Sequence, residues 1–175
     1  VRYLADLHQG RVNPQKIRHN FNPPRDGFDP AVYLQTALTA HRLSEAASAA
    51  APRLPLYEQL RATLAYYREL VDDPAWLKPL PPVRRKVAPG QAYVGLAVLA
   101  QRLIALGYLE ANTSVPTSYQ GALVEAVKSF QKRHGLGADG LIGKTTLAQL
   151  QVTPTARVRQ LELALERLRW TPQRR

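Results

Sequence analysis

The sequence contains no cysteine, and this absence excludes several kinds of chemistry. Without a thiol the chain can form no disulfide, and it has no thiolate to act as nucleophile or metal ligand. Its histidines also lack the paired spacing that is typical of zinc sites. The four are His8, His19, His41 and His134. We therefore predict no catalytic residue, no metal site and no cofactor, and we expect this chain not to be an enzyme.

Long apolar runs are missing as well. None approaches the roughly 18–20 residues that a helix needs to span a bilayer. The chain has no methionine, and it opens within a helical pattern at Val1–Leu4 without a positively charged, apolar leader. We expect an excised or processed piece of a longer protein, with no transmembrane segment of its own.

Acidic residues are scarce, since 13 Asp and Glu stand against 24 Lys and Arg, which gives a net charge of +11. A basic surface favours an anionic partner such as nucleic acid, a lipid surface or a carboxylate-bearing polymer, although it can also be simply solvated. The run Arg84-Arg85-Lys86 adds to a nucleic-acid reading, but no recognition helix or aromatic RNA-binding platform accompanies it. We predict no nucleic-acid partner and keep nucleic-acid binding only as an alternative.

Helical spacing dominates what is present, and no stretch alternates like a strand, so we predict a mainly α fold. Asp29 and Pro30 form a favourable helix start, and that helix is predicted to run to about Ala49. An amphipathic helix follows and stops at Asp72. Its apolar stripe is Leu56, Leu60, Leu64, Tyr67 and Val71.

Prolines interrupt the chain over residues 78–90, and we place a boundary between two modules there, because proline fixes φ and removes a backbone donor. Three short helices are predicted beyond this boundary. The first ends at Gly107, the second runs from Tyr119 or Gln120 to Gly135, and a short third follows.

The stretch Ala126–Leu150 combines an apolar helical face with closely spaced glycines and an Asp-Gly turn. Glycine adopts positive φ at little cost, so these residues suit helix ends and tight turns. Each such role is structural, and the motif specifies a fold and places no reactive group. The fold-specifying residues are Gly107, Gly135, Asp139, Gly140, Gly143 and Thr146.

Residues 89–152 closely resemble the peptidoglycan-binding domain that is often attached to bacterial cell-wall enzymes. Its LxxLG-Y, AVxxFQxxxGL and DGxxGxxT-L segments correspond to Leu103–Tyr108, Ala126–Leu136 and Asp139–Leu147. The resemblance implies a small three-helix bundle that binds glycan strands or stem peptides of peptidoglycan.

Residues 1–88 and 153–175 resemble the helical scaffold of the large murein L,D-transpeptidases. The resemblance is carried by Tyr3–Ile17, Pro55–Leu70 and Leu161–Pro172. It implies a scaffold domain over 1–88, a peptidoglycan-binding domain over 89–152, and a linker helix over 153–175 that returns to the scaffold. It also implies a periplasmic or cell-envelope location, with the catalytic domain of the parent chain as a partner. That domain uses a His and a Cys in a Ser-x-Gly-Cys motif, for which this chain has no matching position.

For ligand contacts we select polar or aromatic residues outside the apolar stripes of the small domain. A basic side chain suits stem-peptide carboxylates, and the face of a tyrosine suits an N-acetylhexosamine. Tyr66 and Trp76 could also stack on sugar rings, and the pattern leaves their roles open. The selected candidates are Arg102, Tyr108, Tyr119, Gln131 and Lys144.

Gly143-Lys144-Thr145 invites a phosphate-loop interpretation, but the first glycine of a Walker A loop would fall at Ala138, and a helix precedes this loop where a strand is required. The favoured hypothesis is therefore a non-catalytic scaffold and peptidoglycan-binding piece of a cell-wall enzyme. The alternative is a purely structural or protein-interaction module without a ligand.

Overall fold

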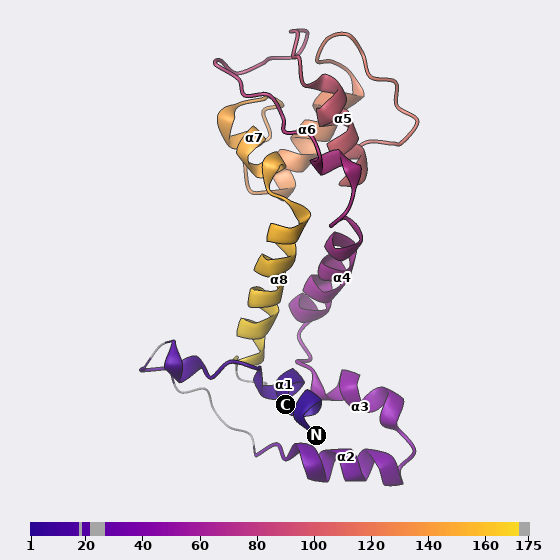
Figure 1. Ribbon diagram of the computed structural model, residues 1–175, viewed down its shortest axis with the longest axis vertical. Coiled ribbons are helices and arrows are strands. Elements are labelled where there is room, and N and C mark those ends of the chain that lie inside the picture. The colour runs from indigo at the N-terminus through magenta and orange to yellow at the C-terminus, as the bar shows by residue number, and fades with distance from the viewer. Residues whose placement is uncertain (18, 22–26, 172–175) are drawn as a thin grey trace. The chain divides into compact units, whose positions relative to one another are not determined.

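The computed structural model describes residues 1–17, 19–21 and 27–171 (Figure 1). Throughout these ranges the regular elements are α-helices and two short 3-10 helices, and no strand is formed. The predicted mainly α fold is therefore confirmed. None of the helices in this part of the chain is both long enough and apolar enough to cross a membrane.

The chain divides into two compact units. Unit 1 comprises Val1–Tyr67 with Arg157–Arg175, and unit 2 comprises Arg68–Ala156. In unit 1, the first three helices lie against one another (Figure 1). Its elements are α1 (Arg2–Gln9), a 3-10 turn (Pro14–Lys16), α2 (Pro30–Thr39), α3 (Leu43–Ala50) and most of α4 (Pro55–Glu69) and α8 (Pro154–Arg169).

The helix predicted from Pro30 to about Ala49 is two helices in the structure. Asp29 caps the first, accepting hydrogen bonds from two backbone amides, as its sequence position predicts. The break lies at His41, whose φ of 53° is in the left-handed region. There the Arg42 amide donates to the Ala37 carbonyl at 2.9 Å, which closes the end of α2. No glycine marks this turn, since a histidine occupies the left-handed position, and the prediction of one continuous helix was wrong.

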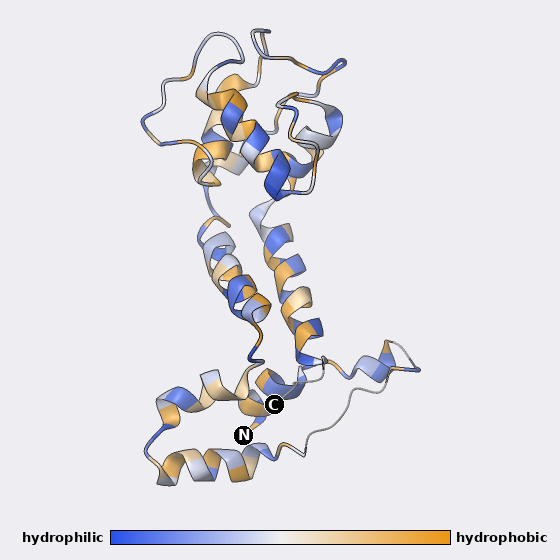
Figure 2. Cartoon of the chain, turned by 180° about the vertical axis from the view of Figure 1, so that it is seen from behind, coloured by the Kyte–Doolittle hydropathy of each residue, from blue (hydrophilic) through white to orange (hydrophobic). Residues whose placement is uncertain are grey.

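Helices α4 and α8 pack through a small apolar cluster that includes Tyr57, Leu64 and Leu165. Figure 2 shows apolar and polar residues alternating along both helices. The buried stripe of α4 begins at Tyr57, which is 1% exposed, and not at Leu56, which is 52% exposed. At 3.6 residues per turn, Tyr57 lies about 20° around the helix from Leu64 and Leu56 about 80°. Choosing Leu56 for the stripe was therefore wrong.

Unit 2 is built on three helices around one apolar core. Helix α6 begins after Gly121, and residues 117–119 before it form a bend, so the predicted start at Tyr119 or Gln120 was too early. The proline-rich stretch contributes Leu80 and Val87 to the core. Val87 also forms an antiparallel bridge to Ile142 through hydrogen bonds of 3.1 and 3.0 Å. The elements are a 3-10 turn (Pro74–Trp76), α5 (Leu96–Ala105), α6 (Ala122–Arg133) and α7 (Lys144–Gln151).

Candidate functional site

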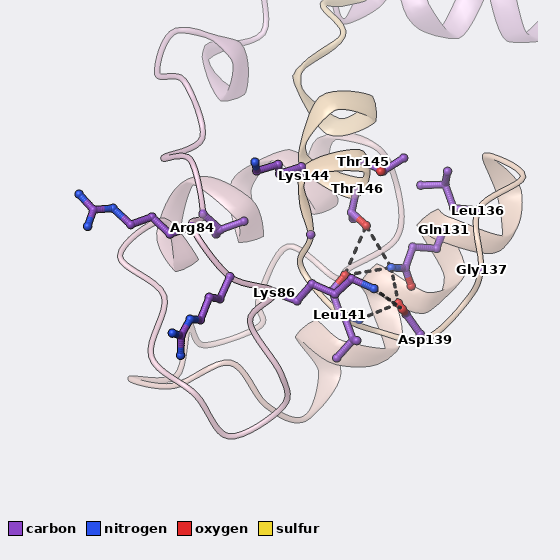
Figure 3. Close-up of a pocket in the computed structure, with 13 residues that line it drawn as sticks. Arg84, Lys86, Gln131, Leu136, Gly137, Asp139, Leu141, Lys144, Thr145 and Thr146 are labelled. Atoms are coloured by element: carbon purple, nitrogen blue, oxygen red, sulfur yellow. Dashed lines mark hydrogen bonds and ion pairs between the residues drawn. The ribbon is translucent and has the colours of Figure 1, made fainter.

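A buried glutamine organises the glycine-containing turn between α6 and α7. Gln131 is 2% exposed, and its Nε2 group lies 2.9 Å from Asp139 Oδ1 and 3.1 Å from both the Leu141 carbonyl and Thr146 Oγ1. Its Oε1 atom accepts a hydrogen bond from the Gly140 amide at 2.9 Å. One side chain thus ties both ends of the turn to α6, as the dashed lines in Figure 3 show.

Asp139 begins this turn and fixes its shape. Its Oδ1 atom also accepts a hydrogen bond from the Leu141 amide at 2.9 Å, which is an Asx turn. That bond, together with the Gln131 amide and the Lys86 ammonium, holds the pKa of the Asp139 carboxyl below its usual value, against a smaller opposing effect of burial. Gly140 follows with a φ of 70°, which a side chain would strain. Asp139 is therefore an ionised, structural carboxylate at the edge of the turn.

An open pocket with a volume of about 430 Å³ lies beside this turn in unit 2. One wall is the stretch 83–86, which precedes the bridge at Val87, and the other is the turn with the start of α7. Figure 3 shows Lys86 extending toward Asp139, with Lys144 and Thr145 at the start of α7. The lining residues are Val83, Arg84, Arg85, Lys86, Gln131, Leu136, Gly137, Asp139, Leu141, Gly143, Lys144, Thr145 and Thr146.

Two of the five predicted ligand contacts line this pocket. Lys144 is exposed at its rim, and Gln131 forms part of its lining, with its polar atoms already engaged in the turn. The fold-specifying residues Asp139, Gly143 and Thr146 line it too. The φ of Gly143 is −106°, which does not require glycine.

Arg102 has a structural role that its polarity did not suggest. It is 2% exposed, and its guanidinium donates to the carbonyls of Ala75 at 3.2 and 3.1 Å, Lys78 at 2.7 Å and Leu150 at 3.2 Å. Burial lowers the pKa of this guanidinium, and the nearby phenol of Tyr93 partly offsets that effect. An arginine nevertheless keeps its charge. It also lies over the ring of Trp76, 5.5 Å from the ring centroid. Arg102 therefore has no surface for a ligand, and we withdraw it as a ligand contact.

Trp76, whose role the sequence left open, is tied into the same region. Its indole Nε1 donates to the Val152 carbonyl at 3.2 Å, and Arg102 covers its ring. These contacts make it a packing residue of unit 2.

Tyr119 is also withdrawn as a ligand contact, because it is fully buried. Its hydroxyl donates to the Gly140 carbonyl at 2.7 Å, so it holds the other side of the glycine turn. Burial raises the pKa of this phenol, and the nearby carboxylates of Asp139 and Glu125 raise it further. Tyr119 thus anchors the segment before α6 to the turn.

Tyr108 is half-buried and does not line the pocket. Its ring packs edge-on against the ring of Phe130, with 5.6 Å between the ring centroids. The imidazole of His134 stacks on the same Phe130 ring, with 3.9 Å between the centroids. The backbone of the preceding Gly107 has a φ of 70°, and that of Gly135 has a φ of 68°, as expected for residues that end α5 and α6. We call Tyr108, Phe130 and His134 the aromatic cluster.

Two regions of the chain match known protein families, one within unit 1 and one within unit 2. Residues 1–64 match the family described as "Scaffold domain". Residues 95–150, which include α5, α6 and α7, match the family described as "Putative peptidoglycan binding domain". Unit 2 is similar to peptidoglycan-binding domains. The predicted combination of a helical scaffold region with a peptidoglycan-binding region is therefore confirmed. No curated protein matches the chain.

Sequence reasoning missed the contribution of Arg84, Arg85 and Lys86 to the pocket. This basic run lies outside the peptidoglycan-binding motif, in the proline-rich stretch where the sequence predicts a boundary between two modules. The bridge between Val87 and Ile142 is what brings it beside α7, and an isolated pair of backbone hydrogen bonds leaves no sequence signal.

Proposed function

We propose that this chain is a non-catalytic peptidoglycan-binding and scaffold part of a bacterial cell-wall protein. The observation that carries the proposal is the match of residues 95–150 to a peptidoglycan-binding family, together with an open pocket in the same unit. Peptidoglycan is then the partner, and the cell envelope is the location. Unit 1 serves as the scaffold, in keeping with the match of residues 1–64.

We further propose that the parent protein is an L,D-transpeptidase-like enzyme and that this chain orients its catalytic domain on peptidoglycan. In this proposal the scaffold spans residues 1–88, the binding domain 89–152 and the returning helix 153–175. The support is the resemblance of the helical regions to that family. Reading the gene beyond the codon for Arg175 tests it, because a Ser-x-Gly-Cys motif is expected there, and a different catalytic domain would exclude this parentage.

Peptidoglycan binding is tested by co-sedimentation of the purified chain with purified sacculi. We expect the chain to pellet with sacculi at low salt and to remain largely bound at about 0.15 M salt, where exposed charges more than about 8 Å apart are screened. A basic protein of similar net charge, without a peptidoglycan-binding domain, is the control for non-specific adsorption. If the chain stays in the supernatant, the purely structural alternative replaces the proposal. A DNA gel shift at about 50 mM salt tests the nucleic-acid alternative, and we expect no retardation.

A further inference from the structure

The pocket beside the glycine turn is strongly cationic. Four basic side chains line it, and Asp139 is its single carboxylate. The Asp139 oxygen atoms are already engaged, one by backbone and side-chain amides and the other by Lys86 Nζ at 4.0 Å. Among the described residues, Arg84, Arg85 and Lys144 form no ion pair with any carboxylate. The pocket therefore carries an excess of positive charge that the protein itself does not neutralise.

The fold fixes the two backbone segments that carry these cations. Arg84, Arg85 and Lys86 directly precede Val87, and Lys144 follows closely after Ile142. Val87 and Ile142 are buried in the core and bonded to each other, so both backbone segments are fixed. An anion that binds between the two segments is attracted by the basic side chains of both.

The remaining lining favours a short aliphatic peptide over a sugar. Val83, Leu136 and Leu141 supply small apolar surfaces, and no aromatic ring lines the pocket. The flat face of an N-acetylhexosamine packs best on an aromatic side chain, which this pocket does not offer. Its volume of about 430 Å³ lies within the range of about 300–1,000 Å³ that is usual for small-ligand sites.

We infer that this pocket binds the carboxylate-bearing stem peptides of peptidoglycan and not its sugar rings. Arg84, Arg85 and Lys144 supply the positive charge for the carboxylates, and the aliphatic residues contact the alanine methyl groups of the stem. This inference rests on the proposed function and assigns the part of the polymer that is recognised.

The test compares two forms of one polymer. Binding of the wild-type chain is measured in solution to uncross-linked glycan strands that carry their stem peptides and to the same strands after an amidase has removed the stem peptides. We expect at least tenfold weaker binding to the stem-free strands. Free stem peptide is expected to compete, whereas stem peptide with its carboxylates converted to amides is expected to compete at least tenfold less well.

Two pocket variants and two matched controls localise the effect. Lys144→Ala and Arg84→Ala are each expected to weaken binding to intact peptidoglycan about tenfold, which corresponds to the loss of one charge-assisted contact. Lys132→Ala and Arg133→Ala remove the same charge from exposed positions of α6 outside the pocket, and we expect less than a twofold change. Urea midpoints of all four variants should match the wild type, because the four side chains are exposed.

The outcomes separate this inference from the function on which it rests. Equal binding to intact and stem-free polymer would overturn the inference and leave peptidoglycan binding standing. Failure to bind either polymer would overturn both. Equal losses in pocket and control variants would show that overall charge, and not the pocket, attracts the polymer. Stronger displacement by a DNA oligonucleotide than by stem peptide would assign the pocket to nucleic acid.

Discussion

Replacement of Arg102 by methionine should destabilise unit 2 severely, although arginine is usually a surface residue. Methionine keeps most of the apolar stem of the side chain and removes the guanidinium. Three carbonyl groups, those of Ala75, Lys78 and Leu150, then lose their donor. They belong to two separate segments, residues 75–78 and the end of α7, so the loss loosens the packing of both segments around α5.

The size of the effect follows from the number of contacts. A hydrogen bond to a charged group contributes about 1.5–3 kcal/mol, and three carbonyls would give roughly 5–9 kcal/mol. Methionine avoids the cost of burying the charge, which offsets several kcal/mol of this sum. We therefore expect a net loss of about 3–5 kcal/mol, because three buried carbonyls are left without a donor at about 1–3 kcal/mol each. With a urea m-value near 2 kcal/mol/M, the midpoint should fall by about 2 M.

Tryptophan fluorescence can follow this change in unit 2 alone. The chain has two tryptophans, Trp76 in unit 2 and Trp170 in unit 1. A Trp170→Phe background leaves Trp76 as the reporter, and this substitution is mild because the Trp170 indole nitrogen has no hydrogen-bond partner in the described structure. Arg133→Met, at an exposed position of α6, is the control and should cost less than about 1 kcal/mol. A loss below about 1 kcal/mol for Arg102→Met would refute the structural role assigned to the guanidinium.

Three further predictions concern backbone geometry and pH. Gly140→Ala places a Cβ on a residue with a φ of 70° and only 3.1 Å from the Lys128 side chain, so the free energy of unfolding of unit 2 should fall by about 1–2 kcal/mol. Gly137→Ala adds a Cβ in open space and is the control, for which the urea midpoint of unit 2 should change little. Burial raises the pKa of Tyr93 from 10.0 to about 12, so the folded state favours the neutral phenol. The resulting contribution to the free energy of unfolding is complete below pH 10 and is lost as the pH rises toward 12. Tyr93→Phe should therefore reduce the fall in unfolding free energy that urea curves show between about pH 9 and 12. Gly10→Ala would bring a Cβ within 2.6 Å of a Glu166 oxygen at a φ of 86°, so Trp170 fluorescence should report a loss of about 2 kcal/mol or more in unit 1, and an unchanged midpoint would contradict the close packing of this turn.

The sequence predicted the helices of unit 2 well, because their apolar stripes and terminal glycines are local signals. Leu99, Leu103 and Phe130 are buried as their spacing requires, and Gly107 and Gly135 end their helices at positive φ. These features depend on residues three or four positions apart, which a single sequence displays directly.

Burial of polar residues was harder to predict, because a buried polar group depends on partners that are distant in the sequence. Arg102 lies three residues after Leu99, on the inner face of α5, so its spacing did place it inside. Tyr119 reaches a carbonyl of the glycine turn, and no local pattern indicates such a bond.

The pocket itself could be predicted only in part. The sequence predicts Lys144 as a ligand contact because it is a basic residue outside the apolar stripes, and Lys144 does line the pocket. The opposite wall comes from residues 83–86, and only the pairing of Val87 with Ile142 brings that wall near. Contacts of this kind join segments more than 50 residues apart, and helical periodicity carries no information about them.

We propose that unit 2 binds peptidoglycan at the cationic pocket. Titration of the ¹⁵N-labelled chain with soluble peptidoglycan fragments, followed by amide chemical shifts, tests it most directly. We predict the largest shifts at residues 84–86, 137–139 and 144–146, with little change in unit 1. Shifts confined to the aromatic cluster of Tyr108, Phe130 and His134 would contradict the claim. So would the absence of shifts at a fragment concentration equal to the peptidoglycan concentration at which binding of the chain to sacculi is saturated.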